Sequence, residues 1–328
     1  ALKAHRINIA LCIFHGALAV FLLILLPALL LPVDAAWGWL LLPWVLISNG
    51  WWALIHESLH GVLHPDPGEN LRWGRIQGVL FGAPYELLRG GHLLHHAFSR
   101  DERDRTEVFT PGPRGQAAVR LAYYFRLLGG LHLFEVAGGL VALLPRPIIR
   151  RVARALARDD NVVEALAARL QAPDTFRRYR TDAAAIALLH ALAFALYGAH
   201  AWMLLLALAG RGLLVSLLDN AFHYGTPLGQ RRHARNLAAP PVLGGLILNF
   251  NLHGSHHLRP GLPWWRLGEF HRAAGHPVDG ALVPAVLAQL RADFEGEEKR
   301  DENCEEERGE QKSFARLCGY LHGVILPV

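Results

Sequence analysis

Cysteine is scarce in this chain of 328 residues, which contains only Cys12, Cys304 and Cys318. The three lie far apart and no CxxC pattern occurs, which excludes a zinc ribbon and a rubredoxin-type iron site. The same spacing argues against a disulfide framework. Lysine is also rare: residues 61–181 contain eighteen arginines and no lysine.

The chain is unusually apolar, with 52% hydrophobic residues and a mean hydropathy of +0.21. The net charge is +5, yet residues 295–310 contain nine acidic and three basic side chains. The rest of the chain is therefore more basic than the net charge suggests. Basic loops beside apolar segments are typical of membrane proteins, so the charge does not indicate nucleic-acid binding.

The N-terminal region predicts a first pair of membrane spans. Residues 7–31 carry no charge, and about 20 apolar residues are enough to cross a bilayer. A signal peptide also starts with basic residues, but this run is too long and no small-residue cleavage site follows it. After a turn at 32–36, residues 36–55 form the second predicted span. Its tryptophans are typical of the headgroup level of a membrane.

Three short runs of histidine contain eight of the nineteen histidines in the chain. They read HxxxH (His56, His60), HxxHH (His92, His95, His96) and HxxHH again (His253, His256, His257). On a helix, positions i, i+3 and i+4 share one face, so each run directs its imidazoles the same way. Imidazole binds Fe, Cu, Zn and Ni, and eight histidines are about right for two ions.

Residues 61–181 connect the first apolar pair to a second. Within them, residues 121–144 predict an interfacial or re-entrant helix, and residues 148–171 a basic amphipathic helix on a membrane surface. Residues 183–198 and 199–220 predict two spans with a turn near Gly198. One span over 183–209 followed by a surface helix is the alternative. Two spans are favoured because they return the chain to the side of the histidine runs.

The expected fold is therefore all-α and membrane-embedded, with four transmembrane helices. By the positive-inside rule, the arginine-rich segment and both termini face the cytoplasm. We expect residues 1–293 to form the membrane domain and residues 294–328 a charged tail of unknown role. A bacterial inner membrane is the expected location.

Single polar residues near the runs are further candidates. His223 lies where the last span returns to the surface, and Asp219, one turn earlier, is expected to hold water or orient an imidazole. Arg211 lies within that span and is a candidate for a substrate carboxylate or headgroup, with snorkelling to the surface as the alternative. Weaker candidates for positions behind the metal ligands are Glu57, Asn249, Asp104 and Glu107. Isolated histidines such as His15, His132, His190 and His200 are expected to serve in packing.

Two other classes of function compete for these motifs. A metal transporter would place its ligands near the middle of the membrane, whereas these runs lie at span ends. A zinc-dependent membrane hydrolase would use His56-Glu57-Ser58-Leu59-His60 as an HExxH motif with Glu57 as the base. That motif needs one further ligand and leaves both HxxHH runs without a role.

The three runs in this order, with span pairs between them, resemble the integral-membrane fatty acid desaturase and hydroxylase superfamily. The resemblance covers roughly residues 5–275. It includes His256-His257-Leu258-Arg259-Pro260-Gly261-Leu262-Pro263-Trp264 after the third run and the acidic stretch at 104–107.

The resemblance implies a mushroom-like fold, in which four spans carry a cytoplasmic helical cap that holds two irons. It implies that the eight run histidines are iron ligands and that His223 is the additional one. In acyl-CoA desaturases an asparagine four residues before that histidine holds a metal-bound water, and Asp219 occupies this place here.

The chemistry that follows is oxidative. Zinc binds imidazole but has no redox chemistry, whereas iron with O2 as co-substrate can break an unactivated C–H bond. We expect hydrogen abstraction from a fatty acyl or other lipid chain, most simply desaturation. Hydroxylation, carotenoid-type oxygenation and decarboxylation to a terminal alkene are the alternatives on the same scaffold, chosen by substrate placement.

The sequence contains no motif typical of an electron-transfer module. It contains neither the HPGG segment of a fused cytochrome b5 nor a CxxC pattern. A separate ferredoxin, rubredoxin or cytochrome b5 is therefore expected as the electron donor. Such donors are usually acidic, and the arginine-rich cytoplasmic face would steer them.

Overall fold

The fold begins with a long helical hairpin. The computed structural model describes residues 2–101, 115–156, 162–227, 229–230 and 233–291, and these contain helices and no β-strand. The outgoing arm is α1 (Leu2–Val20) and η1 (Phe21–Leu30), and the returning arm is η2 (Ala35–Leu40), α2 (Leu41–Leu46) and α3 (Ser48–Leu59). At the turn, the Asp34 carboxylate accepts a hydrogen bond of 2.8 Å from the Ala36 amide, which caps the returning arm.

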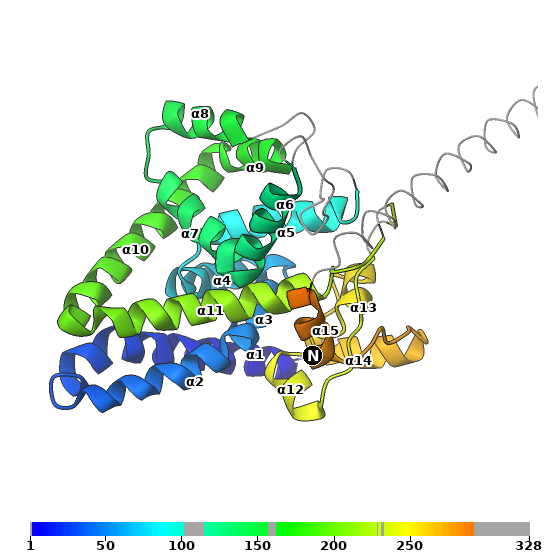
Figure 1. Cartoon of the computed structure of the whole chain (residues 1–328), viewed down its shortest axis with the longest axis horizontal. Helices are drawn as coiled ribbons and strands as arrows, with labels where there is room; N and C mark the ends of the chain where they lie inside the picture. The colour runs from blue at the N-terminus through cyan, green and yellow to red at the C-terminus, as the bar shows by residue number, and fades with distance from the viewer. Residues whose placement is uncertain (1, 102–114, 157–161, 228, 231–232, 292–328) are drawn as a thin grey trace, which may run out of the picture.

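A second hairpin packs on the first. It consists of α10 (Pro173–Tyr197), the short turn η4 (Gly198–His200) and α11 (Ala201–Ala221). Gly198 has a φ of +50°, a conformation that glycine adopts without steric cost, which confirms the turn predicted there. Figure 1 shows the turns of both hairpins at the same end of the molecule. The Tyr197 hydroxyl donates to the Leu22 carbonyl at 2.8 Å and ties the two together.

The helix α10 starts ten residues earlier than the predicted span. Its first three turns are polar, and ion pairs whose carboxylates are buried hold them against the helices α4 (Pro67–Phe81) and α5 (Tyr85–Phe98). Arg75 binds Asp182 at 2.6 Å, and Arg178 donates to Glu86. Asp182 and Glu86 are both nearly fully buried. Since buried charges need partners, these pairs fix α10 to α4 and to α5, the helix that carries the second histidine run.

A layer of shorter helices lies around the end of α10 away from its turn and along α11 (Figure 1). The helices are α6 (Gly115–Phe125), η3 (Arg126–Gly130), α7 (Leu131–Val141), α8 (Arg146–Leu156) and α9 (Val162–Leu170). The backbone kinks at Leu128 and Gly129, so the apolar segment predicted at 121–144 folds as two helices. The surface helix predicted at 148–171 is likewise not a single surface element, because α9 packs on α5.

The C-terminal part of the described chain lies at the end of α11 and of the first hairpin that is away from the turns (Figure 1). It consists of α12 (Pro241–Leu246), α13 (His253–Leu258), α14 (Trp264–Ala273), α15 (Leu282–Ala288) and η5 (Gln289–Arg291). The tail predicted at 294–328 lies outside the described residues, and so do Asp104 and Glu107.

Within the described residues, two helical stretches are long and apolar enough to cross a membrane. They are His5–Leu30 and Pro173–Ala221, and the second includes the turn η4. The pair Ala35–Leu46 and Ser48–Leu59 would be a third, bent by 46°. Leu25, Leu205 and Leu206 on these stretches are between 42% and 62% exposed, as expected of helices whose outer surface faces lipid.

Candidate metal centre

Helices from three distant parts of the chain bring the histidine runs together. His56 lies in the last turn of α3 and His60 directly after it, while α5 and α13 carry the second and third runs. The short helix α13 can lie close to its supporting loop only because position 254 is glycine. A Cβ atom at Gly254 would lie 2.3 Å from the Ala234 carbonyl oxygen.

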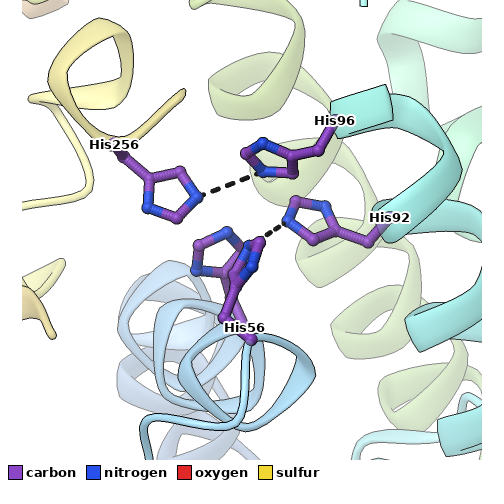
Figure 2. Close-up of side chains that lie close together, drawn as sticks. His56, His92, His96 and His256 are labelled. Atoms are coloured by element: carbon purple, nitrogen blue, oxygen red, sulfur yellow. Dashed lines mark hydrogen bonds between the residues drawn. The ribbon is translucent and has the colours of Figure 1, made fainter. Parts of the chain in front are cut away.

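The nine histidines singled out in the sequence gather in two groups, within each of which the candidate ligand nitrogens lie within 4.8 Å of one another. The five-histidine group contains His56, His60, His92, His96 and His256. The four-histidine group contains His95, His223, His253 and His257. Figure 2 shows side chains of the first group converging from three separate helices. Each group thus combines residues from distant parts of the sequence.

The ring nitrogens face one another at short range. The Nε2 atoms of His60 and His92 are 2.8 Å apart, and those of His96 and His256 are 3.2 Å apart. In the other group, the Nε2 atoms of His95 and His223 are 3.2 Å apart, and those of His253 and His257 are 3.1 Å apart.

This spacing fits metal coordination. Two nitrogens that bind one ion at about 2.1 Å and at right angles to each other lie roughly 3 Å apart. Nε2 of His56 is buried and has no hydrogen-bond partner among the residues that the structure describes, which is costly unless another group satisfies it. A metal ion would satisfy this atom and would also explain why so many lone-pair donors point at one another.

The protonation state of the cluster also fits. Burial, followed by repulsion from neighbouring charges, lowers the pKa of His60 to about 4. The same two causes lower the pKa of His92, His253, His256 and His257 well below its ordinary value. These imidazoles are therefore neutral at physiological pH, the form that binds a metal.

His223 joins the cluster without belonging to a run. It lies in the turn that follows α11, where the Tyr224 amide donates to the Asn220 carbonyl at 2.9 Å. The Thr226 hydroxyl donates to the His223 carbonyl at 2.7 Å. The ring of Phe222 stacks on that of His253, with centroids 4.7 Å apart. The hairpin topology therefore places His223 beside the third run, as the two-span prediction required.

A cavity with a volume of about 290 Å³ opens beside the histidines. Its walls include His92 of the five-histidine group and His95 and His253 of the four-histidine group. The other lining residues are mostly apolar and come from α3, α5, α7, α9 and α11: Trp52, Leu87, Leu88, Gly91, Leu131, Phe134, Leu166 and Val215. A small number of polar groups in an apolar cavity is typical of a binding site for a small molecule.

Three charged residues also line this cavity: Asp219, Arg126 and Glu135. Asp219 was predicted from its position one turn before His223, whereas Arg126 and Glu135 were not. Glu135 accepts a hydrogen bond of 3.0 Å from Nδ1 of His132, a histidine interpreted from the sequence as a packing residue. The His-x-x-Glu spacing on one helix face was the available signal for this pair.

Glu57 and Asn249 bind the same residue. The buried Glu57 carboxylate accepts from the Trp264 amide at 3.2 Å. Nδ2 of Asn249 donates to the Trp264 carbonyl at 3.1 Å. Both residues therefore fix the segment after the third run, and their predicted place behind the metal ligands stays a prediction.

Arg211 lies in an aromatic cage inside the helix bundle. Its guanidinium carbon is 4.3 Å from the ring centre of Trp44, 4.5 Å from that of Phe81 and 5.1 Å from that of Trp51. The side chain is 0% exposed, so the snorkelling alternative is wrong. One nitrogen donates to the Phe81 carbonyl at 3.1 Å, at the C-terminal end of α4, where a positive charge is favourable.

Comparison with known proteins gives one match. Residues 32–282 match the family model described as Fatty acid desaturase. This range contains all nine clustered histidines and the cavity. Neither the curated proteins nor the solved structures contain a match to the chain.

Proposed function

This chain belongs to the fatty acid desaturase family, and we propose that it is a di-iron membrane oxidase that uses O2 to desaturate a fatty acyl or other lipid chain. Family membership implies an oxidoreductase that acts on lipid at a membrane. The observation that carries the finer proposal is the pair of histidine groups with one apolar cavity beside both. We propose all nine histidines as ligands of two iron ions.

Iron bound by these imidazoles would supply the reductive activation of O2 that cleavage of an unactivated C–H bond requires. The contribution of the chain is placement. Leu88, Leu131, Phe134 and Val215 would hold an apolar chain against the histidine wall and exclude water from it. Which C–H bond lies nearest to His92, His95 and His253 would then decide the position of the reaction.

Asp219 would act as a hydrogen-bond acceptor at the edge of this site. It lines the cavity together with His95 and His253, and every proposed ligand is a neutral imidazole. A carboxylate is the natural counter-charge for cations held by neutral ligands. We propose that Asp219 orients a water molecule or an imidazole N–H there.

We propose that the two hairpins cross the membrane four times. Each hairpin arm is a helical stretch with an apolar outer surface, and both turns lie at the end of the molecule away from the covering helices (Figure 1). The arginine-rich residues 61–181 provide most of those covering helices, which supports a cytoplasmic cap and cytoplasmic termini. A bacterial inner membrane would be the location.

The electron donor would be a separate ferredoxin, rubredoxin or cytochrome b5. Arg150, Arg151 and Arg154 are exposed on α8, which packs on α9, and α9 contributes Leu166 to the cavity wall. An acidic donor docked on α8 would therefore lie next to α9, the helix that forms part of the cavity wall. Electrostatic attraction of this kind raises association rates and weakens with salt.

A zinc hydrolase fits the site less well. Its base would be Glu57, whose carboxylate is buried and bound to the Trp264 amide. Its zinc would be bound by His56 and His60, which share their group with three further histidines. A hydrolase would also leave the four-histidine group without a role.

Metal and product analysis of the detergent-purified protein test the proposal together. We expect about two irons per chain, one for each histidine group, whereas a hydrolase would contain one zinc. Fatty acid, acyl-CoA and carotenoid would each be incubated with reductant, donor and O2. A new double bond without added oxygen supports desaturation; an alcohol or a terminal alkene would move the proposal to hydroxylation or decarboxylation. A protein that binds no iron contradicts it.

A further inference from the structure

Trp264, the first residue of α14, has all three of its polar groups bound to different parts of the chain. Its amide donates to Glu57 at 3.2 Å, and its carbonyl accepts from Asn249 at 3.1 Å. Its indole Nε1 donates to Oδ1 of Asn8 at 3.0 Å. A residue bonded in this way connects α1, α3 and the loop before α13 at a single point.

The elements joined at Trp264 carry the first and third histidine runs. Glu57 follows His56 directly on α3, and Asn249 precedes the third run by four residues. Asn8 also donates to the Leu63 carbonyl at 2.9 Å, in the loop that follows His60. The Trp264 contacts therefore fix the separation between the first run and the third.

These contacts are costly to lose. The Glu57 side chain is nearly fully buried, and a buried polar group that loses its hydrogen-bond partner destabilises the fold. Leu248 and Asn249 have φ values of +52° and +56°, a left-handed region that asparagine tolerates and leucine disfavours. The bond from Asn249 to Trp264 is one contact that holds the backbone in this conformation just before the third run.

Only one of the two histidine groups depends on this separation. The five-histidine group combines His56 and His60 of the first run with His256 of the third. The four-histidine group has no member from the first run. A displacement of the first run away from the third would therefore open the five-histidine group and leave the other group closed. A displacement of the third run would disturb both groups, because His253 and His257 belong to the four-histidine group.

We propose that Trp264 and its partners Glu57 and Asn249 are positioning residues that assemble the metal site of the five-histidine group. The inference rests on the proposed two-metal function. Glu57 acts here through the Trp264 amide, as an acceptor that holds the chain. This role needs an oxygen atom and does not need a negative charge.

A separate contact supports the other group and provides a matched control. Nδ2 of Asn220, which lies three residues before His223, donates to Oε1 of Gln289 at 2.7 Å. Nε2 of Gln289 donates to the Leu217 carbonyl at 2.6 Å. Gln289 is fully buried, and it fixes the end of α11 that leads to His223.

The test measures iron binding of the full-length protein in detergent. Ferrous iron is titrated anaerobically into wild type, Glu57→Leu, Glu57→Gln, Asn249→Gly and Gln289→Leu, and bound iron per chain is counted. Mössbauer spectra distinguish an ion bound by five imidazoles from one bound by four. Glycine tolerates the positive φ at position 249, so Asn249→Gly removes only the side-chain donor to the Trp264 carbonyl. The hydrogen bond between Glu57 and the Trp264 amide stays in place in this variant.

We expect Glu57→Leu and Asn249→Gly to weaken the five-histidine site by about tenfold or more, the usual cost of losing a support behind a metal ligand. The spectrum of Glu57→Leu should retain the signal of the four-histidine site, because that group has no member from the first run. Glu57→Gln keeps an acceptor oxygen for the Trp264 amide and should bind two irons as wild type does. Gln289→Leu should weaken the four-histidine site instead.

Three results separate the possible failures. Wild-type binding in both Glu57→Leu and Asn249→Gly overturns the positioning role while the proposed function stands. Equal loss in Glu57→Gln and Glu57→Leu assigns the function of Glu57 to its charge and also overturns that role. A wild-type protein that binds no iron removes the proposed function itself.

Discussion

His60 and His92 direct their Nε2 atoms at each other across 2.8 Å, although 32 positions separate them in the chain. The first belongs to the end of the first hairpin and the second to the helix α5. Two lone-pair donors at this distance repel each other unless a proton or a cation lies between them. The five-histidine group repeats this arrangement with His96 and His256 at 3.2 Å.

His256→Ala tests the five-histidine group directly. Removal of a ligand should abolish turnover and lower bound iron from about two per chain to about one. Metal analysis and product formation from an acyl substrate are the measurements. His200→Ala, a histidine at the turn of the second hairpin, is the control and should behave as wild type. Normal iron content and activity in the His256 variant would refute the ligand assignment.

His223→Ala tests the residue that no sequence run identifies. We expect the four-histidine site to lose iron while the five-histidine site keeps it, because His223 belongs to the former group only. The change in affinity should reach about a hundredfold, at or above the upper end of what losing a support behind a ligand costs. Ferrous titration followed by spectroscopy is the measurement. If both sites lost iron affinity to the same extent, His223 would not be a ligand of the four-histidine site alone.

Much of this centre could be predicted from the sequence because the spacing of a helix is fixed. The runs at His92 and His253 direct their side chains to one side on any helix, and the span count required His223 to return to the same side. The assignment of each histidine to a group could not be predicted, since it depends on how α3, α5 and α13 pack. The shared binding of Trp264 by Glu57 and Asn249 was also hidden, because its backbone atoms carry no sequence signal.

The early start of α10 shows the same limit in the fold. Hydropathy placed the beginning of the span at residue 183, where charged residues end. The helix continues back to Pro173 because Arg178 and Asp182 find partners on α5 and α4. A hydropathy pattern reports the cost of placing a charge in lipid and cannot report a partner 92 or 107 positions away.

Arg211→Lys tests whether the caged arginine binds substrate or supports the bundle. The sequence proposed a substrate headgroup, whereas full burial among Trp44, Trp51 and Phe81 favours support. Lysine keeps the charge but is more strongly hydrated and cannot stack in a plane. We expect a loss of about 1–3 kcal/mol in stability, with an unchanged apparent KM. Thermal unfolding in detergent and substrate titration are the measurements; a raised KM at unchanged stability would restore the headgroup role.

Gly91→Leu tests whether the cavity is the binding site of the substrate chain. Gly91 lines the cavity on α5 beside His92, and a Cβ atom there would have no neighbour within 4 Å. A leucine side chain therefore enters the cavity without strain in the backbone. We expect kcat/KM for a long acyl chain to fall by about tenfold or more, with iron content unchanged. Gly268→Leu, at a helical glycine on α14 with equally free space, should leave kcat/KM unchanged. Equal effects of the two substitutions, or loss of iron in the first, would place the substrate elsewhere.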